Sequence, residues 1–232
     1  MIDLPRLNDR KLALSSWLPD SWNCQSLSAL GRYWDHLDKP KQWPTLTFPF
    51  PWKIETNNPW WSRDLKKGEI ACSLAHNEAW KIASNQEGYT LILEDDAFGA
   101  PDVDVWLSDA LERTTRYDPS WDLLYCGRVA MAPDQQFCEE KLVVPGYSHC
   151  TYGYVVSQNG AKTLVKSNII EHMMPVDEFL PAHYMAHPRS DVRGLDFRRI
   201  RAYAVQPDII LQRHKIVFGS ETEASDVYLG TS

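Results

Sequence analysis

The sequence lacks a long apolar run, an excess of basic residues and an apolar leader. No stretch of about 18 apolar residues occurs in the chain, so we expect no membrane-spanning helix. Residues 1–10 contain no apolar core of the kind that a secretion signal needs, and Asp3 and Arg6 already carry charge. The formal net charge of −7 disfavours a general nucleic-acid binder, which needs a basic surface.

Paired cysteines and glycine-rich phosphate loops are also missing. The five cysteines lack the spacing of a metal site and favour free thiols in a reducing compartment, so we expect a cytoplasmic protein. Peripheral attachment to a membrane and the oligomeric state stay open. No Walker or dinucleotide-type loop follows an expected strand, which disfavours kinases and dehydrogenases. The lack of Gly-x-Ser-x-Gly similarly disfavours an α/β-hydrolase.

Apolar periodicity divides most of the chain into alternating strands and helices. Helices are expected over 68–83, 103–117 and 161–165, and strands over 89–93, 122–126, 154–157, 202–205 and 209–211. This alternation predicts a single α/β domain with a mainly parallel sheet flanked by helices.

Residues 41–61 interrupt this pattern, because proline and tryptophan recur there and break every regular period. One interpretation is an irregular insertion whose aromatic side chains pack on the core. The other is an aromatic platform for a sugar or peptide acceptor, since tryptophan offers a large amphipathic face. The sequence leaves both open.

The stretch L-I-L-E-D-D at 91–96 places Glu94, Asp95 and Asp96 directly after a buried strand. Ligands of open α/β sheets bind at the carboxyl ends of the strands. Three roles suit the carboxylates: ligands of Mn²⁺ or Mg²⁺, which in turn holds a nucleotide diphosphate; general acid–base catalysis; or a solvated acidic turn before the next helix.

Several segments, in the same order, resemble glycosyltransferase family 25. They are I-D-L-P-R-L-N-D-R-K (2–11), K-K-G-E-I-A-C-S-L-A-H (66–76), L-I-L-E-D-D (91–96), W-D-L-L-Y-C-G-R (121–128), Y-G-Y-V-V-S-Q-N-G-A-K-T-L (152–164) and P-V-D-E-F-L-P (175–181). That family includes bacterial lipooligosaccharide galactosyltransferases and the procollagen galactosyltransferases, and the segment at 175–181 is closest to the procollagen branch. Ala71, Ala75 and Asp3 depart from the family pattern.

The resemblance implies a GT-A fold over residues 1–232, a UDP-sugar donor, Mn²⁺ (or Mg²⁺) and inversion at the anomeric carbon. The expected reaction moves galactose or glucose to a hydroxyl group. The acceptor is either hydroxylysine of a collagen-like peptide or a lipopolysaccharide-type saccharide. Two alternatives remain: a non-catalytic nucleotide-sugar-binding module that kept the fold, and a metal-dependent hydrolase in which water attacks.

The resemblance also assigns roles to residues that each have a simpler interpretation. Asp96 is the expected metal ligand with His214, which is otherwise a surface histidine. Glu94 and Asp95 are expected to bind the donor. Arg10, Glu69 and His76 are expected to join them; the respective alternatives are a solvated helix start, a helix cap and a buried hydrogen-bonded histidine.

The motif at 175–181 supplies the expected catalytic base. Inversion needs a carboxylate to take the proton of the attacking hydroxyl, and Asp177 is the first candidate, with Glu178 second. The alternative is that Asp177 caps the helix that follows, because aspartate is a favoured N-cap residue.

Overall fold

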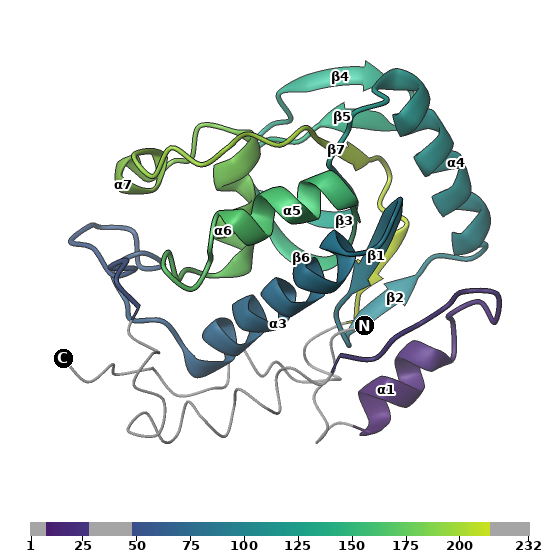
Figure 1. The fold of residues 1–232 in the computed structure, drawn as a ribbon, viewed down its shortest axis with the longest axis horizontal. Helices are drawn as coiled ribbons and strands as arrows, with labels where there is room; N and C mark the ends of the chain where they lie inside the picture. Colours follow the sequence, from purple (N-terminus) through teal and green to yellow (C-terminus); the bar gives the residue numbers. More distant parts are fainter. Residues whose placement is uncertain (1–7, 28–47, 214–232) are drawn as a thin grey trace.

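The computed structural model describes residues 8–27 and 48–213, without the side chains of 8–11 (Figure 1). The helices are α1 (Asn8–Ser15), α3 (Lys67–Ser84), α4 (Val103–Tyr117), α5 (Gln158–Lys166), α6 (Val176–Tyr184) and α7 (Ser190–Arg193). The strands are β1 (Tyr89–Leu93), β2 (Ala97–Gly99), β3 (Leu123–Ala130), β4 (Gln136–Glu139), β5 (Leu142–Val144), β6 (Ser148–Ser157), β7 (Ala202–Val205) and β8 (Ile210–Gln212).

A six-stranded sheet in the order β1-β6-β3-β7-β5-β4 forms the centre of the described chain, and β2 pairs separately with β8. The α/β class with flanking helices is confirmed, but the expectation of a mainly parallel sheet is wrong. Among the described strands only β3 and β7 pair in parallel. The reason is β6, which lies antiparallel between β1 and β3. Strands β1, β3 and β7 therefore do run in one direction, as the alternation predicted.

This topology brings the start of β6 to the same edge of the sheet as the end of β1. Leu93 at the end of β1 pairs with Gly153, and the amide of Glu94 donates to the carbonyl of Tyr152. Residues 148–152 consequently lie beside the carboxylates that follow β1.

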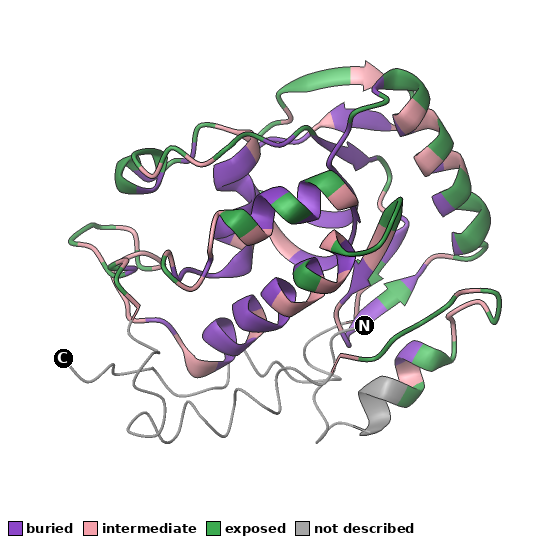
Figure 2. Cartoon of the chain, in the orientation of Figure 1, coloured by how far each residue is buried: buried purple, intermediate pink, exposed green. Residues whose placement is uncertain are grey.

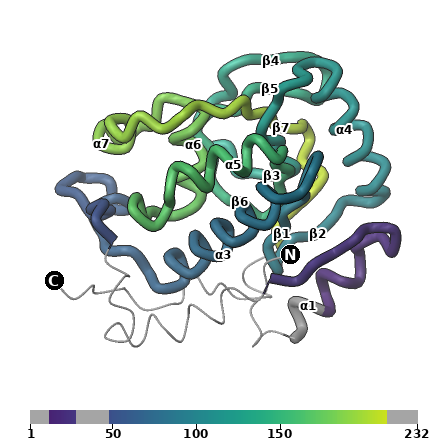
Figure 3. Tube along the Cα trace, viewed as in Figure 1, coloured from purple at the N-terminus to yellow at the C-terminus, as the bar shows by residue number. Residues whose placement is uncertain are grey.

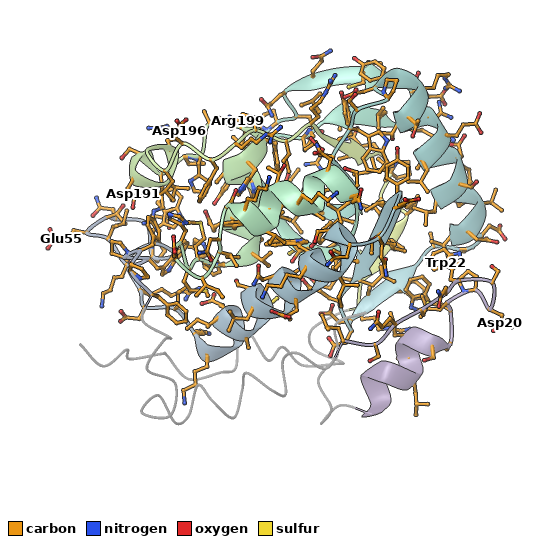
Figure 4. All side chains as sticks on the ribbon, viewed as in Figure 1. Asp20, Trp22, Glu55, Asp191, Asp196 and Arg199 are labelled. Atoms are coloured by element: carbon orange, nitrogen blue, oxygen red, sulfur yellow. The ribbon has the colours of Figure 1, made fainter. Side chains whose placement is uncertain are left out.

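Each face of the sheet carries its own hydrophobic core. Figure 2 shows that much of the sheet and parts of the helices beside it are buried. Along β6, Tyr154 and Val156 belong to the core beneath α3, α5 and α6, whereas Val155 belongs to the core beneath α4. Alternate side chains of a strand point to opposite faces, so a strand covered on both sides reads as a continuous apolar run. Figure 4 shows side chains filling the layer between the sheet and helices α3, α5 and α6.

Strand β8 crosses closely over β3 and β6. A Cβ atom on Gly127 would collide with the carbonyl oxygen of Ile210, and one on Gly153 would collide with the Ile210 side chain. Glycine is needed here because only its bare backbone permits this approach. The crossing carries the yellow end of the trace in Figure 3 to β2, next to the acidic residues after β1.

The predicted helices and strands agree well with the structure. The predicted bounds of 89–93, 103–117 and 202–205 match β1, α4 and β7, and the other predicted elements lie within or next to observed ones. The described part of the Trp/Pro-rich segment, 48–61, forms no regular helix or strand, and its Trp52, Trp60 and Trp61 pack against the core under α3 and α6. None of the helices in the described ranges is long and apolar enough to cross a membrane.

Candidate active site

The three carboxylates that follow β1 form a partly covered turn, called here the acidic corner (residues 94–96). Asp95 and Asp96 are 7% and 8% exposed, so both are largely shielded from water. The amide of Ala97 donates to the carbonyl of Glu94 and closes the turn into β2. Burial of several carboxylates in one turn is costly unless positive charge or donors compensate it.

Glu94 is fixed by donors from the core side. Its Oε1 accepts a 2.5 Å hydrogen bond from the hydroxyl of Thr151 and lies 3.2 Å from Nε2 of His76. Nδ1 of His76, which is fully buried, lies 2.7 Å from the hydroxyl of Tyr154, which also accepts from the indole N–H of Trp80. A chain of hydrogen bonds therefore connects the buried face of α3 with the acidic corner.

Cys72 lies one helical turn before His76 and faces the same corner. The ligand atoms of Cys72, His76 and Glu94 lie within 4.8 Å of one another, a spacing that could hold a cation. Burial, together with the negative charges of Glu94, Asp177, Asp96 and Asp95, raises the pKa of the Cys72 thiol well above its usual value. The thiol thus senses four carboxylates at once, which places Asp177 in the same electrostatic environment as the acidic corner.

Asp96 is reached from the end of the described chain. Nε2 of Gln212 donates to Oδ2 of Asp96 at 3.0 Å, and the amide of Arg213 donates to the Asp96 carbonyl at 2.9 Å. His214, the expected second metal ligand, lies outside the described residues, and so does the side chain of Arg10 within α1. Both assignments stay predictions.

Asp177 faces the acidic corner from the first turn of α6. The N-cap position of this helix is Pro175, and one oxygen of the half-buried Asp177 carboxylate accepts from the amide of Cys150 at 3.3 Å. Burial raises the pKa of Asp177 to about 6; the Cys150 amide and His149 oppose this, whereas Glu178 and Glu94 add to it. The side chain therefore points across to β6 instead of capping its own helix.

Consecutive residues of β6 hold the two acidic groups. The Cys150 amide binds Asp177, and the Thr151 hydroxyl binds Glu94. Because adjacent residues of one strand are about 3.3 Å apart along the chain, both carboxylates converge on the same short stretch of backbone. Cys150 has a left-handed backbone conformation, with φ of 65°, at this point.

Glu178, the next residue after Asp177, is completely buried and surrounded by hydrogen-bond donors. Its Oε1 accepts from the indole N–H of Trp60 at 2.7 Å and from the hydroxyl of Tyr147 at 2.6 Å, and Nε2 of His149 lies 3.3 Å away. The indole N–H of Trp61 makes a longer contact of 3.4 Å with the same oxygen.

The second oxygen of Glu178 faces His187. Oε2 lies 2.7 Å from Nε2 of His187, whose Nδ1 accepts from the amide of Arg189, so Nε2 carries the proton that is donated to Glu178. Burial alone raises the pKa of Glu178, but hydrogen bonds from His149, His187 and Tyr147 outweigh it and hold the pKa well below its usual value. Glu178 therefore stays an anion at mildly acidic pH, at which Asp177 becomes protonated.

Glu69 is engaged at the start of α3. Its carboxylate accepts from the amide of Lys66 at 2.8 Å and forms two hydrogen bonds with Arg63, at 2.5 and 2.9 Å. Two of the alternatives from the sequence are thus present as contacts: Glu69 caps α3, and His76 is buried and hydrogen-bonded. The donor-binding roles of both residues stay predictions.

Comparison of the sequence with known proteins shows which family the chain resembles. Residues 52–180 match the family model described as "Glycosyltransferase family 25 (LPS biosynthesis protein)". The chain is 33% identical over 184 residues to "Procollagen galactosyltransferase 2" of Homo sapiens, covering 74% of this chain and 29% of that protein. It is 34% identical over 163 residues to "Glycosyltransferase 25 family member" of Aedes aegypti, covering 68% and 26%.

The chain belongs to glycosyltransferase family 25. It spans less than a third of the length of these curated relatives. Similarity does not guarantee turnover, because a relative in Rattus norvegicus, 31% identical over 171 residues (72% of this chain, 29% of that protein), is named "Probable inactive glycosyltransferase 25 family member 3".

Residues 52–180, which match the family model, contain most of the predicted site residues. They include Glu69, His76, Glu94, Asp95, Asp96, Asp177 and Glu178, but not Arg10 or His214. The structure brings His76, the acidic corner and Asp177 together, whereas Glu69 lies with Arg63 at the start of α3.

Sequence reasoning missed the residues that hold these carboxylates. Thr151, Gln212 and His149 come from segments distant in the sequence, and no local motif pairs them with Glu94, Asp96 or Glu178. A signal existed only for His187, because His187-Pro188 follows the motif at 175–181.

Proposed function

We propose that this chain is an inverting, metal-dependent hexosyltransferase that moves galactose or glucose from a UDP-sugar to a hydroxyl group of an acceptor. The observation that carries this proposal is that neighbouring residues of β6 bind two unlike acidic groups. Cys150 and Thr151 hold Asp177 and Glu94. A carboxylate suited to accept a proton thus faces a group of carboxylates suited to hold a cation.

Asp177 is the proposed catalytic base. A base is most effective when its pKa lies near the working pH, and burial raises the pKa of Asp177 to about 6. At neutral pH it is ionised and takes the proton of the acceptor hydroxyl as the oxygen attacks the anomeric carbon. The bond from that carbon to the UDP oxygen breaks in the same step, and the pair of electrons leaves with UDP.

The acidic corner is the proposed metal and donor site. The negative charges of Glu94, Asp95, Asp96 and Asp177 all raise the pKa of the Cys72 thiol, which supports a shared environment that favours a cation. Asp96 would hold Mn²⁺ or Mg²⁺, both of which prefer carboxylate oxygen, while Glu94, Asp95 and His76 would position the donor. When bound, the cation would neutralise charge on the diphosphate leaving group.

The acceptor remains a choice between two classes of hydroxyl compound. The name of the human relative, "Procollagen galactosyltransferase 2", supports hydroxylysine in a collagen-like peptide. The description of the family model, "LPS biosynthesis protein", supports a saccharide. Both acceptors present a hydroxyl to the same base, so the proposed chemistry is the same for each.

The proposal is tested by UDP release from UDP-galactose and UDP-glucose, with Mn²⁺ or with EDTA, against collagen-like peptides that contain hydroxylysine and against saccharides. We expect release that needs both the metal and one acceptor class. Asp96→Asn and Asp177→Asn should abolish most of it. Asp20→Asn is the matched control, because Asp20 is exposed on an outer loop, where Figure 4 labels it.

Two outcomes favour other functions. If the wild type binds UDP in the presence of Mn²⁺ but releases none from either donor with any acceptor, the chain is a non-catalytic binding module. The "probable inactive" name of the rat relative is the observation that keeps this second candidate in view. If release is fast and independent of acceptor, water is the attacking group and the transferase proposal fails.

A further inference from the structure

Trp60 lies between the first turns of two helices that carry the proposed site. Its indole N–H donates to Oε1 of Glu178 in α6 at 2.7 Å. On its ring face, the guanidinium carbon of Arg63 lies 4.1 Å from the ring centroid. Arg63 in turn forms two hydrogen bonds with Glu69 in α3. A continuous chain of contacts therefore runs from Glu178 through Trp60 and Arg63 to Glu69.

The two glutamates occupy equivalent places. Each is the third residue of its helix, since α3 begins at Lys67 and α6 begins at Val176. Helix α3 also carries His76, which contacts Glu94, and α6 carries Asp177. Whatever fixes the starts of these helices relative to each other also fixes the proposed base relative to the acidic corner.

We propose that Trp60 and Glu178 are positioning residues, whose hydrogen bond, extended through Arg63 to Glu69, fixes the start of α6 relative to the start of α3. The inference rests on the proposed function for its catalytic consequence, and on contacts alone for its structural one. It also gives the described end of the Trp/Pro-rich segment a role in holding the two helices, in place of that of an exposed aromatic platform.

The chemistry of the contacts favours this role over simple packing. A hydrogen bond to a buried carboxylate is charge-assisted and strongly directional, and a guanidinium over an indole ring adds a cation–π attraction. Both interactions use the indole specifically, since its N–H is the donor to Glu178 and its ring face holds the Arg63 guanidinium. Trp61, which also points its N–H at Glu178, makes only a 3.4 Å contact and serves as an internal comparison.

The segment that contains Trp60 has other attachments, so its loss of one hydrogen bond should leave the fold intact. Arg189 donates to the carbonyl of Trp52 at 2.6 Å and stacks over the Trp52 ring. The amide of Ile54 donates to the carbonyl of Trp61 at 2.9 Å. Trp60→Phe keeps an aromatic face toward Arg63 and removes the indole donor, and Trp61→Phe reproduces the accompanying loss of ring size.

The first experiment compares Trp60→Phe with Trp61→Phe by amide hydrogen exchange. We expect faster exchange at 176–180 and at 66–70 in Trp60→Phe, because both helix starts lose their common contact. Trp61→Phe should stay close to the wild type. Equal exchange in the two variants and the wild type would overturn the inference, and this result does not depend on any activity.

The second experiment measures kinetics of the same variants with the acceptor class that supports turnover. A misplacement of reacting groups by about 1 Å can cost about 100-fold in rate, so Trp60→Phe should lower kcat by about 10- to 100-fold. The KM for the UDP-sugar should stay within about twofold, since the donor contacts proposed for Glu94, Asp95 and His76 do not belong to this chain of contacts. A residue with a general packing role would instead change the melting temperature without this split between kcat and KM.

Glu178→Gln provides the check on the partner. It keeps the size of the side chain but removes its charge, and Glu55→Gln is its control, because Glu55 lies exposed in the same segment and points outward in Figure 4. If the hydrogen bond couples the two helices, the fold-decrease in kcat of the double variant Trp60→Phe/Glu178→Gln should be smaller than the product of the fold-decreases of the two single variants. Full multiplicativity would contradict the inference. A wild type without transferase activity would refute the proposed function while leaving the exchange result to decide this one.

Discussion

Neighbouring carboxylates have similar surroundings in the acidic corner at 94–96 but different surroundings in the acidic pair at 177–178. In the corner, three acids share one environment that also reaches Asp177 and Cys72. In the pair, adjacent residues diverge: donors from several segments hold Glu178 as an anion, whereas burial raises the pKa of Asp177 to about 6. The number of donors that the fold aims at each carboxylate, and not its position in the sequence, decides whether it can act as a base.

The largest expected effect is on kcat, when Asp177, the proposed base of the acidic pair, is replaced. Asp177→Asn removes the proton acceptor while it keeps the shape of the side chain, so kcat should fall by about 1,000-fold. Binding of UDP with Mn²⁺, measured by calorimetry, should change little. If this variant keeps most of its acceptor-dependent turnover, Asp177 is not the base.

Loss of a carboxylate in the acidic corner should have the next largest effect. Asp96→Asn should lower kcat/KM by about 100-fold, because the remaining acids hold the cation less well and the leaving group loses part of its electrostatic stabilisation. Titration of the rate with Mn²⁺ checks this, and the variant should need much more Mn²⁺ for half-maximal rate. An unchanged Mn²⁺ requirement would place the metal elsewhere.

Replacement of Glu178 should lower stability more than replacement of Asp177 does. Glu178→Gln should lower the free energy of unfolding by about 2 kcal/mol at pH 7, since buried hydrogen bonds to a charged group are lost. Because the folded-state pKa of Glu178 is depressed, its stabilisation is present above its ordinary pKa of about 4.3 and is lost as pH falls below it. Urea unfolding at pH 7 and pH 3 measures this, and a difference that grows toward pH 3 would contradict it.

The smallest effect concerns the pH dependence of the rate. Asp177 must be ionised to act as a base, so kcat should level off above about pH 7 and fall about fivefold between pH 6 and pH 5. The residual activity of Asp177→Asn should lack this acidic limb. A limb that begins near pH 4 in the wild type would show that burial does not perturb Asp177.

Much of the architecture was predictable from the sequence. The apolar run before Glu94 identifies β1, because a strand that is buried on both faces has no polar positions. The amphipathic pattern of 103–117 identifies α4, because a helix that is buried on one face has apolar residues at helical spacing. The direction of β6 was not predictable, since nothing in 148–157 records that the strand inserts between β1 and β3. The hairpin β4–β5 was also missed, because its strands of four and three residues are too short to show a period.

The candidate site was also predictable only in part. The acidic residues after β1 were recognisable in the sequence, and the resemblance to the family indicated Asp177. The different behaviour of Asp177 and Glu178 could not be foreseen, because it depends on Trp60, Tyr147, His149 and His187, which only the tertiary fold brings to one carboxylate.

The most direct test is a crystal structure of the chain with Mn²⁺ and UDP, with the metal located by its anomalous scattering. The account predicts manganese bound to a carboxylate oxygen of Asp96 and to the diphosphate, with Asp177 facing the side where the sugar would be attached. Manganese and UDP bound together at a place that contacts neither Asp96 nor its neighbours in the corner would contradict it.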